Sequence, residues 1–149
     1  MSAALAHAPE FDKLEAAMAC APQACCPVAH RFTPGLYIRE ILLPAGTLLT
    51  SAIHKTEHPF VVSAGIVRVM EPGQPPVTIE APYTGITTPG TRRLLYAIED
   101  TIWTTFHPTT RGEDELDQII TDLVDDPPHL AATNFIPAYK SDLHAPCIM

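Results

Sequence analysis

Basic residues are scarce in this sequence, and their scarcity excludes one large class of function. The 149 residues include 9 Lys and Arg against 17 Asp and Glu, which gives a formal net charge of −8. The basic residues stand singly, apart from the pair Arg92 and Arg93. A nucleic-acid-binding protein needs a basic stripe or patch to meet the phosphates. We therefore expect no nucleic-acid partner.

Long apolar runs are also absent. No run approaches the roughly 20 residues that a membrane-spanning helix needs, and residues 1–7 lack the basic start and apolar stretch of a signal peptide. We expect no membrane association and a cytoplasmic protein, whose cysteines stay reduced. The four cysteines lack the paired C-x2-C spacing of a zinc module and are interpreted as ordinary thiols, with a Cys26–His30 metal or nucleophile pair as the alternative.

Long uninterrupted helices are excluded by 16 prolines. At 149 residues one domain is expected. Its residue composition and spacing distinguish three regions: residues 1–33, 34–107 and 108–149. In the first region, Phe11, Leu14 and Met18 fall at helical spacing after Pro9, which predicts a short helix at about 10–19. A loop containing three of the cysteines follows it.

The central region, 34–107, has the residue pattern of short strands separated by turns. Runs rich in β-formers, such as 37–43, 66–70 and 101–107, alternate with turns that contain glycine and proline. Strands spaced by 8–12 residues are typical of an all-β barrel or sandwich. The central region therefore predicts a single all-β barrel.

The last region, 108–149, begins with an acidic amphipathic segment. Apolar residues recur at helical spacing between Gly112 and Asp125, and acidic residues fill the opposite face, so we expect a helix that Pro127 and Pro128 end. The simplest role for the acidic face is solvated surface, with a partner surface as the alternative. The tail beyond it could pack back on the barrel or on another subunit.

Three histidines in the β region are candidate metal ligands. His54 and His58 stand four residues apart in a stretch that joins two strands, with Glu57 beside them as a possible oxygen ligand or general base. His107 shares one face of the last strand with Trp103 and Thr105. Neutral imidazole is a good ligand for zinc, iron, nickel and copper. Surface histidines in turns are the alternative interpretation.

The run from Gly46 to Gly65 resembles the first motif of the cupin superfamily, G-x5-H-x-H-x3-E-x6-G. Its glycines fall in register, and His54 stands at the second motif histidine. The second motif, G-x5-P-x-G-x2-H-x3-N, is matched by Gly85 and by Pro89-Gly90. The resemblance covers residues 35–107. In the detail of its residues, the chain is similar to small uncharacterised cupin-domain proteins of bacteria and phages. It implies a cupin-type β-barrel, a double-sheet jelly roll, that forms a homodimer.

Departures from the two motifs affect the metal ligands. Ala52 replaces the first motif histidine, His58 stands at the glutamate position, and Arg93 stands near the second-motif histidine. A metal site would therefore be rebuilt from His54, His58 and His107. Of the two neighbouring arginines only one should point inward, because they alternate in a strand; a surface arginine paired with the acidic helix is the alternative.

Two functions remain open at this point. In the first, a divalent metal (zinc, iron, nickel or manganese) binds His54, His58 and His107 and acts on a small oxygen-rich, anionic metabolite in the barrel. Glu57 would then be the acid/base, and the substrate contacts would come from Arg93, Tyr37, Arg39, Tyr96 and Trp103. In the second, the barrel has lost its metal and is a binding module for a small molecule or a protein. Whether the protein is an enzyme stays open.

Overall fold

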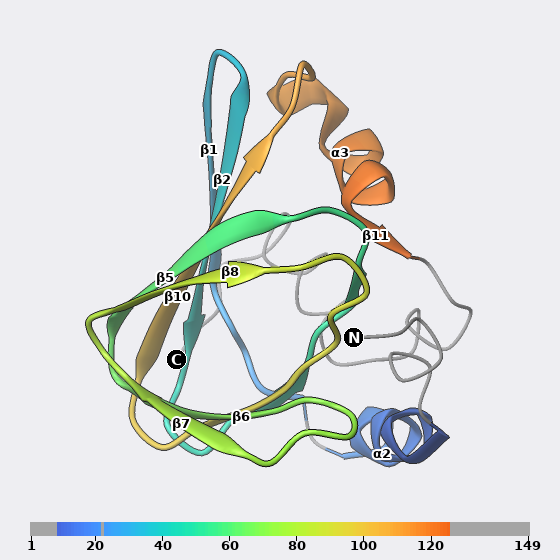
Figure 1. Ribbon diagram of the computed structural model, residues 1–149, viewed down its shortest axis with the longest axis vertical. Coiled ribbons are helices and arrows are strands. Elements are labelled where there is room, and N and C mark those ends of the chain that lie inside the picture. The colour runs from blue at the N-terminus through green and yellow to red at the C-terminus, as the bar shows by residue number, and fades with distance from the viewer. Residues whose placement is uncertain (1–8, 22, 126–149) are drawn as a thin grey trace.

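The computed structural model describes residues 9–21 and 23–125, and within them strands predominate (Figure 1). Helix α2 spans Pro9–Ala19, and the turn η1 (Glu113–Glu115) and helix α3 (Leu116–Leu123) come near the end of the described chain. The strands between and after them are β1 (Val28–Thr33), β2 (Leu36–Leu43), β3 (Leu48–Thr50), β4 (Ile53–His54), β5 (His58–Ala64), β6 (Ile66–Met70), β7 (Val77–Glu80), β8 (Tyr83–Thr87), β9 (Leu94–Ala97), β10 (Thr101–Pro108) and β11 (Val124–Asp125).

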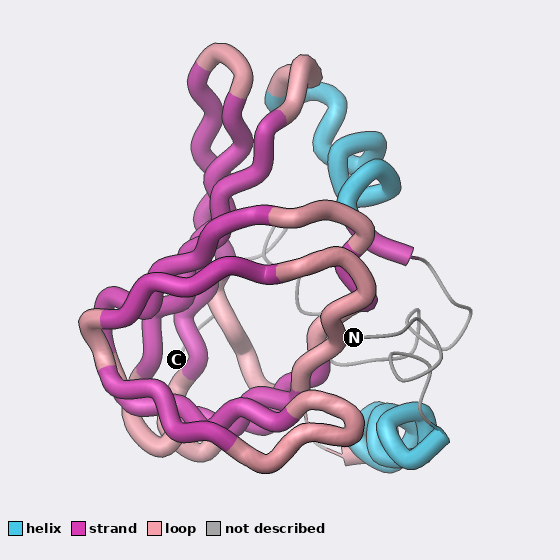
Figure 2. The backbone as a smooth tube through the Cα atoms, in the orientation of Figure 1, coloured by secondary structure: helices cyan, strands magenta, loops and turns pink. Residues whose placement is uncertain are grey.

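The strands form two larger antiparallel sheets that face each other, and β4 pairs separately with β11. One sheet has the order β1-β2-β10-β5-β8 and the other has the order β3-β9-β6-β7. Apart from the hairpin of β6 and β7, strands that follow one another from β2 to β10 within these sheets alternate between them. Without β1, the remaining eight strands have the double-sheet order of a jelly roll. The predicted all-β double-sheet barrel is confirmed, and Figure 2 shows the strands wrapping round it with the helices at its periphery.

The main core fills the space between the two sheets. Its centre is a stack of Phe60 from β5 on Trp103 from β10, with ring centroids 4.4 Å apart and an interplanar angle of 10°. Offset aromatic stacking adds to the burial of these large rings. Aliphatic side chains from both sheets surround the stack: Ile41, Leu43, Leu49, Val62, Val67, Val69, Ile79 and Leu95.

Helix α2 matches its predicted position and closes a smaller core of Phe11, Met18 and Leu94. Beneath the helix lies Arg92, which is completely buried and forms ion pairs with Asp12 at 3.0 Å and Glu15 at 2.8 Å. The alternative of a surface arginine paired with the acidic helix after residue 112 does not hold for Arg92, which is buried and pairs with the N-terminal helix. A buried guanidinium is stable only with partners of this kind.

The acidic segment near the end of the chain differs from the predicted continuous helix over 112–125. Leu116 to Leu123 is helical, but Val124 turns to an extended conformation with φ −131° because β11 pairs with β4. Lys55 strengthens this attachment, since its backbone N–H donates to the Leu123 carbonyl at 2.8 Å and its Nζ donates to the Thr121 carbonyl at 2.9 Å. The predicted stop at Pro127-Pro128 and the tail lie outside the described residues.

Other expectations are partly met. Strand β1 lies in the region 1–33, for which only a helix and a loop were expected. Cys20 and Cys26 are not disulfide-bonded, whereas Cys25 is, so the expectation of ordinary thiols is wrong for Cys25. In the described part of the chain, each helix is too short or too polar to span a lipid bilayer.

Gly46 and Gly65, which begin and end the run that resembles the first cupin motif, should differ sharply in their tolerance of alanine. Both have positive φ, +85° at Gly46 and +89° at Gly65, but a Cβ at Gly46 meets open space, whereas one at Gly65 overlaps the Asp100 carbonyl oxygen and Thr101. We expect Gly46→Ala to lower the free energy of unfolding by about 1–2 kcal/mol through backbone strain, and Gly65→Ala to lower it by about 3 kcal/mol or more. Urea denaturation followed by Trp103 fluorescence measures both, and equal losses would contradict the structure.

Candidate functional site

A cavity of about 320 Å³ opens between the two sheets, on the side where α3 and β11 cross the barrel. Strands β2, β3, β5, β8, β9 and β10 supply lining residues, and so do the paired strands β4 and β11. Seven of the nine predicted site residues line this one cavity: Tyr37, Arg39, His54, His58, Arg93, Trp103 and His107.

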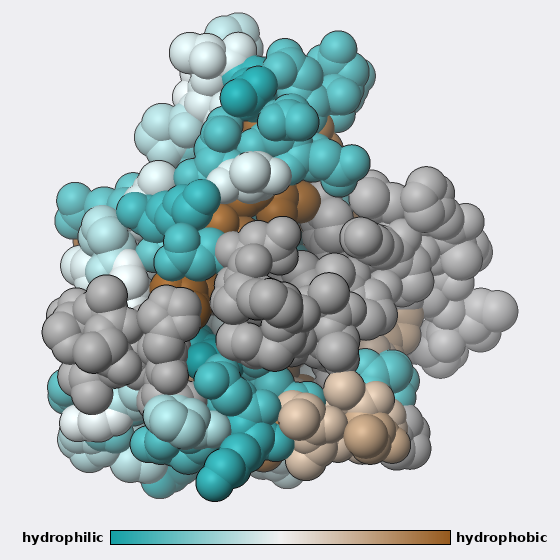
Figure 3. All heavy atoms as spheres, turned by 90° about the vertical axis from the view of Figure 1, so that its right-hand side faces the viewer, coloured by the Kyte–Doolittle hydropathy of each residue, from teal (hydrophilic) through white to brown (hydrophobic). Residues whose placement is uncertain are grey.

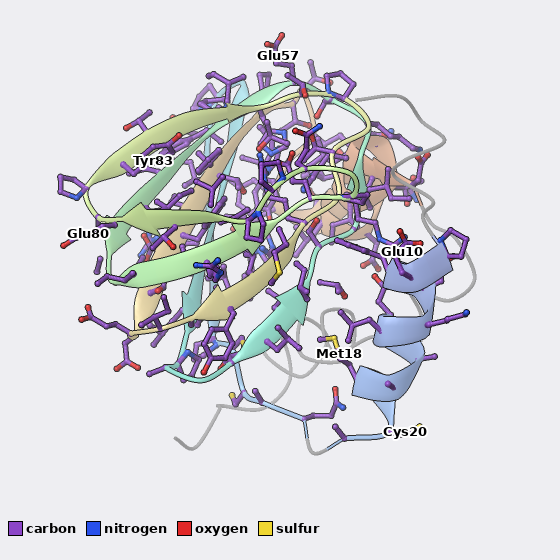
Figure 4. The ribbon with its side chains drawn as sticks, turned by 60° about the horizontal axis from the view of Figure 1, so that its bottom comes forward. Glu10, Met18, Cys20, Glu57, Glu80 and Tyr83 are labelled. Carbon is purple, nitrogen blue, oxygen red and sulfur yellow. The ribbon has the colours of Figure 1, made fainter. Side chains whose placement is uncertain are left out.

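Two predicted site residues do not reach the cavity. Glu57 is exposed and points away from the barrel in Figure 4, because the neighbouring His58 at the start of β5 points inward. Tyr96 on β9 is 41 % exposed, and its neighbour Leu95 lines the cavity instead. Both corrections follow from the alternation of side chains along a strand. The acid/base role of Glu57 and the contact of Tyr96 with a substrate are therefore not supported.

The three histidines meet at one end of the cavity. The ring of His58 lies 4.9 Å from that of His54 and 4.3 Å from that of His107, measured between centroids. His54 comes from the short strand β4, and His58 and His107 come from β5 and β10, which are hydrogen-bonded neighbours in one sheet. Ala52, in place of the first motif histidine, is buried and also lines the cavity.

Hydrogen bonds fix the protonated nitrogen of two of these rings. His58 Nδ1 lies 3.1 Å from the Thr56 carbonyl oxygen, which can only accept, so Nδ1 carries the proton. The Thr105 hydroxyl donates to the Arg39 carbonyl at 3.4 Å and accepts from His107 Nε2 at 2.8 Å. The second nitrogens, His58 Nε2 and His107 Nδ1, are buried without a hydrogen-bond partner, as is His54 Nδ1.

Burial keeps the three imidazoles neutral. It lowers the pKa of His107 to about 3, with further lowering by His58 and Arg39. The pKa of His54 lies well below its ordinary value, first through burial and then through His58 and Arg93. Burial also lowers the pKa of His58, against the opposing effect of its hydrogen bond to Thr56. At neutral pH the cavity therefore presents three nitrogen lone pairs and no positive charge from histidine.

Tyr37 connects the histidines to the covering helix. Its ring stacks on His107 at 5.7 Å and packs against Ile119 and Leu123 of α3. Its hydroxyl lies 2.8 Å from His30 Nδ1. Burial raises the pKa of Tyr37 to about 12, so the phenol stays neutral. The wall of the cavity and the helix over it thus share one small core.

Arg93 is the inward-pointing member of the arginine pair. Its Nε donates to Glu71 Oε1 at 3.1 Å and its Nη1 donates to Thr87 Oγ1 at 2.8 Å. The guanidinium lies over Phe60 at 5.1 Å and over Trp103 at 5.8 Å from the ring centroids. Its plane is therefore fixed by stacking and its charge is balanced by one acid.

The covering segment contributes lining residues that the sequence did not single out as functional. They are Asp117, Ile120, Thr121 and Leu123 from α3, with Val124 and Asp125 from β11. Figure 3 shows that the upper part of the face that carries α3 is mainly hydrophilic, in agreement with the predicted acidic outer side. Spacing alone assigned the apolar side of this helix to packing, and no local signal placed it over the cavity.

The donor set fits a metal ion by its chemistry. Neutral imidazoles that donate one N–H to a carbonyl or hydroxyl and keep the other nitrogen bare are the usual form of metal-ligating histidines. Among residues 9–21 and 23–125, however, no group of three or more His, Cys, Asp or Glu side chains is already gathered so that it could hold a metal.

Acid should destabilise the protein through these buried rings. Unfolded His107 takes up a proton near its ordinary pKa of 6.5, whereas the folded ring does so only near 3, so the free energy of unfolding falls as the pH falls below 6.5. For chelator-dialysed protein we expect His107 alone to account for about 2 kcal/mol of loss between pH 7 and pH 5. His107→Gln should flatten the urea-derived stability profile by that amount, and parallel profiles for the two proteins would contradict the assignment.

Comparisons with known proteins find similarity among solved structures. No family profile matches the sequence, and no curated protein matches it. An acetylacetone dioxygenase from Acinetobacter johnsonii is 15 % identical with a TM-score of 0.46, over 54 % of this chain and 58 % of that one. A cupin-2 domain protein from Shewanella frigidimarina is 13 % identical (TM-score 0.45, 72 % and 100 % covered), and the Cnp3 cupin domain of Schizosaccharomyces pombe is 14 % identical (TM-score 0.49, 75 % and 77 % covered).

These identities and TM-scores carry no statement about activity. The fold rests on the strand order, in which β2-β10-β5-β8 faces β3-β9-β6-β7. With that order, this chain folds as a double-sheet jelly-roll barrel, the fold that its sequence resemblance implies.

Proposed function

We propose that the cavity binds a divalent metal ion through His54, His58 and His107 and a small anionic molecule beside it. The observation that carries the proposal is the set of three buried, unpartnered imidazole nitrogens at one end of an otherwise largely apolar cavity. Burying an acceptor without a partner costs about 1–3 kcal/mol each, and a metal ion satisfies all three at once. Zinc, iron, nickel and manganese all accept this kind of site.

The residues around the proposed ion have separate tasks. Thr56 and Thr105 orient the rings of His58 and His107 by accepting their N–H groups. Arg93 provides a fixed positive charge over the Phe60–Trp103 stack, and solvent-exposed Glu57 receives no role. Three protein ligands leave a position open for water or substrate, so a bound ion would supply a Lewis acid. The ion would also have to draw the rings together, since they are not gathered beforehand.

The second candidate is a metal-free binding module. One observation favours it: Glu71 already balances the charge of Arg93 within the protein. The Arg93 charge therefore needs no bound ion to compensate it. In that case the imidazole nitrogens would accept hydrogen bonds from the bound molecule itself. Homodimerisation and a cytoplasmic location remain predictions for both candidates.

Metal analysis separates the two candidates. Untagged protein purified without chelators is incubated in turn with Zn²⁺, Fe²⁺, Ni²⁺ and Mn²⁺, desalted, and analysed by inductively coupled plasma mass spectrometry. We expect about one ion per chain for at least one metal, and a loss of about tenfold or more in affinity in His58→Ala and His107→Ala.

His30→Ala is the matched control, because His30 is a partly buried histidine of the same barrel that does not line the cavity. It should retain the metal. Circular dichroism confirms that each variant is folded. Equal metal content in the wild type and in both cavity variants, or metal in none of them, would remove the metal site and leave the binding module.

A further inference from the structure

We infer that the molecule held in the cavity is a small monocarboxylate with an apolar body, that Arg93 receives its carboxylate, and that Glu71 limits the affinity by holding the same guanidinium. This inference deepens the proposed function, on which its choice of cavity rests, but it does not depend on the metal ion.

The guanidinium of Arg93 has hydrogen-bonding capacity left for a ligand. Its side chain is only 10 % exposed, and of its five N–H groups the bonds to Glu71 and Thr87 use two. Because the guanidinium stacks on Phe60 and Trp103, the plane in which its remaining N–H donors lie is fixed. A planar fork of fixed orientation suits the two oxygens of a carboxylate.

The position of Arg93 directs this fork. Arg93 lines both the main cavity and a second cavity of about 430 Å³ on the side of β7 and β8. Its Nε partner, Glu71, lines only the second cavity, whereas its Nη1 partner, Thr87, lines only the main one. The Nη end of the guanidinium is therefore on the side of the three histidines. Glu71 binds the Nε end from the side of the second cavity.

Charge limits the ligand to one negative group. Arg93 brings one positive charge that Glu71 already shares, and the histidines are neutral, so the site has no charge to offer a second negative group. Asp117 and Asp125, which also line the cavity, repel a second negative charge. A dianionic phosphate is thus disfavoured relative to a carboxylate.

The rest of the wall specifies the body of the ligand. Aliphatic side chains from both sheets and from α3 face the cavity: Ile41, Leu49, Leu95, Ile120 and Leu123. Such a lining binds a hydrocarbon group and offers few partners to hydroxyls. The ligand is therefore less rich in oxygen than the sequence suggested.

Isothermal titration calorimetry with benzoate and 3-methylbutanoate tests the inference, with benzamide as the neutral analogue and inorganic phosphate as the dianion. The protein is first dialysed against a chelator and then against chelator-free buffer. We expect at least one of the carboxylates to bind about tenfold or more tightly than benzamide, with phosphate weaker than that carboxylate.

Two substitutions should act in opposite directions. Arg93→Gln removes the fork and should weaken carboxylate binding by about tenfold or more, whereas Glu71→Gln frees the fork and should strengthen binding severalfold. Glu80→Gln is the matched control, because Glu80 is an exposed acid on β7 that points outward in Figure 4, and it should leave binding unchanged. A merely structural role for Glu71 could not produce tighter binding.

The inference fails if neither carboxylate is preferred to benzamide, or if Glu71→Gln leaves carboxylate binding unchanged or weaker. Failure of the metal site shows separately, in the metal analysis. Opposite shifts in the chelator-treated protein would support the carboxylate site even when no ion binds.

Discussion

The pairing of β10 with β2 along one edge and with β5 along the other is the constraint on which both the barrel and the cavity depend. Its register sets Trp103 opposite Ile41 and Val62, and His107 opposite Tyr37. Because side chains alternate along a strand, this register sends Trp103, Thr105 and His107 into the barrel together. A shift by one residue would replace them with Thr104 and Phe106 and would remove both the aromatic core and one corner of the histidine cluster.

Polar groups inside the barrel are arranged in two ways that differ in their consequences. Arg92 and Arg93 are neighbours in sequence, but they point to opposite sides of the wall. Arg92 is enclosed by two acids of α2 and belongs to the structural framework. Arg93 shares its charge with one acid and faces a cavity. Buried charges of the first kind are retained for folding, whereas partly satisfied groups beside a cavity mark places where a ligand completes the arrangement.

The sequence was informative wherever the argument was local or periodic. Turn residues and β-forming runs predicted the barrel, and strand alternation brought Trp103 and His107 to one wall. The same alternation, applied to Glu57 and Tyr96, would have placed both outside. Contacts between distant segments could not be predicted: the two-residue ladder that joins β11 to β4 has no sequence signal, and Glu71 lies at a turn whose residues are chosen for the turn itself. The pairing of Arg92 with α2 was missed for the same reason.

Segment 113–125 forms part of the cavity wall while remaining outside the main core. It packs through its own cluster with Tyr37 and is joined to β4 by two residue pairs, whereas the large core lies mainly between the two sheets. Substitutions on the inner side of α3 therefore change the shape of the cavity without touching the residues that hold the barrel together. The part of the cavity wall that α3 and β11 supply can therefore change during evolution, or be redesigned, while the core between the two sheets is kept.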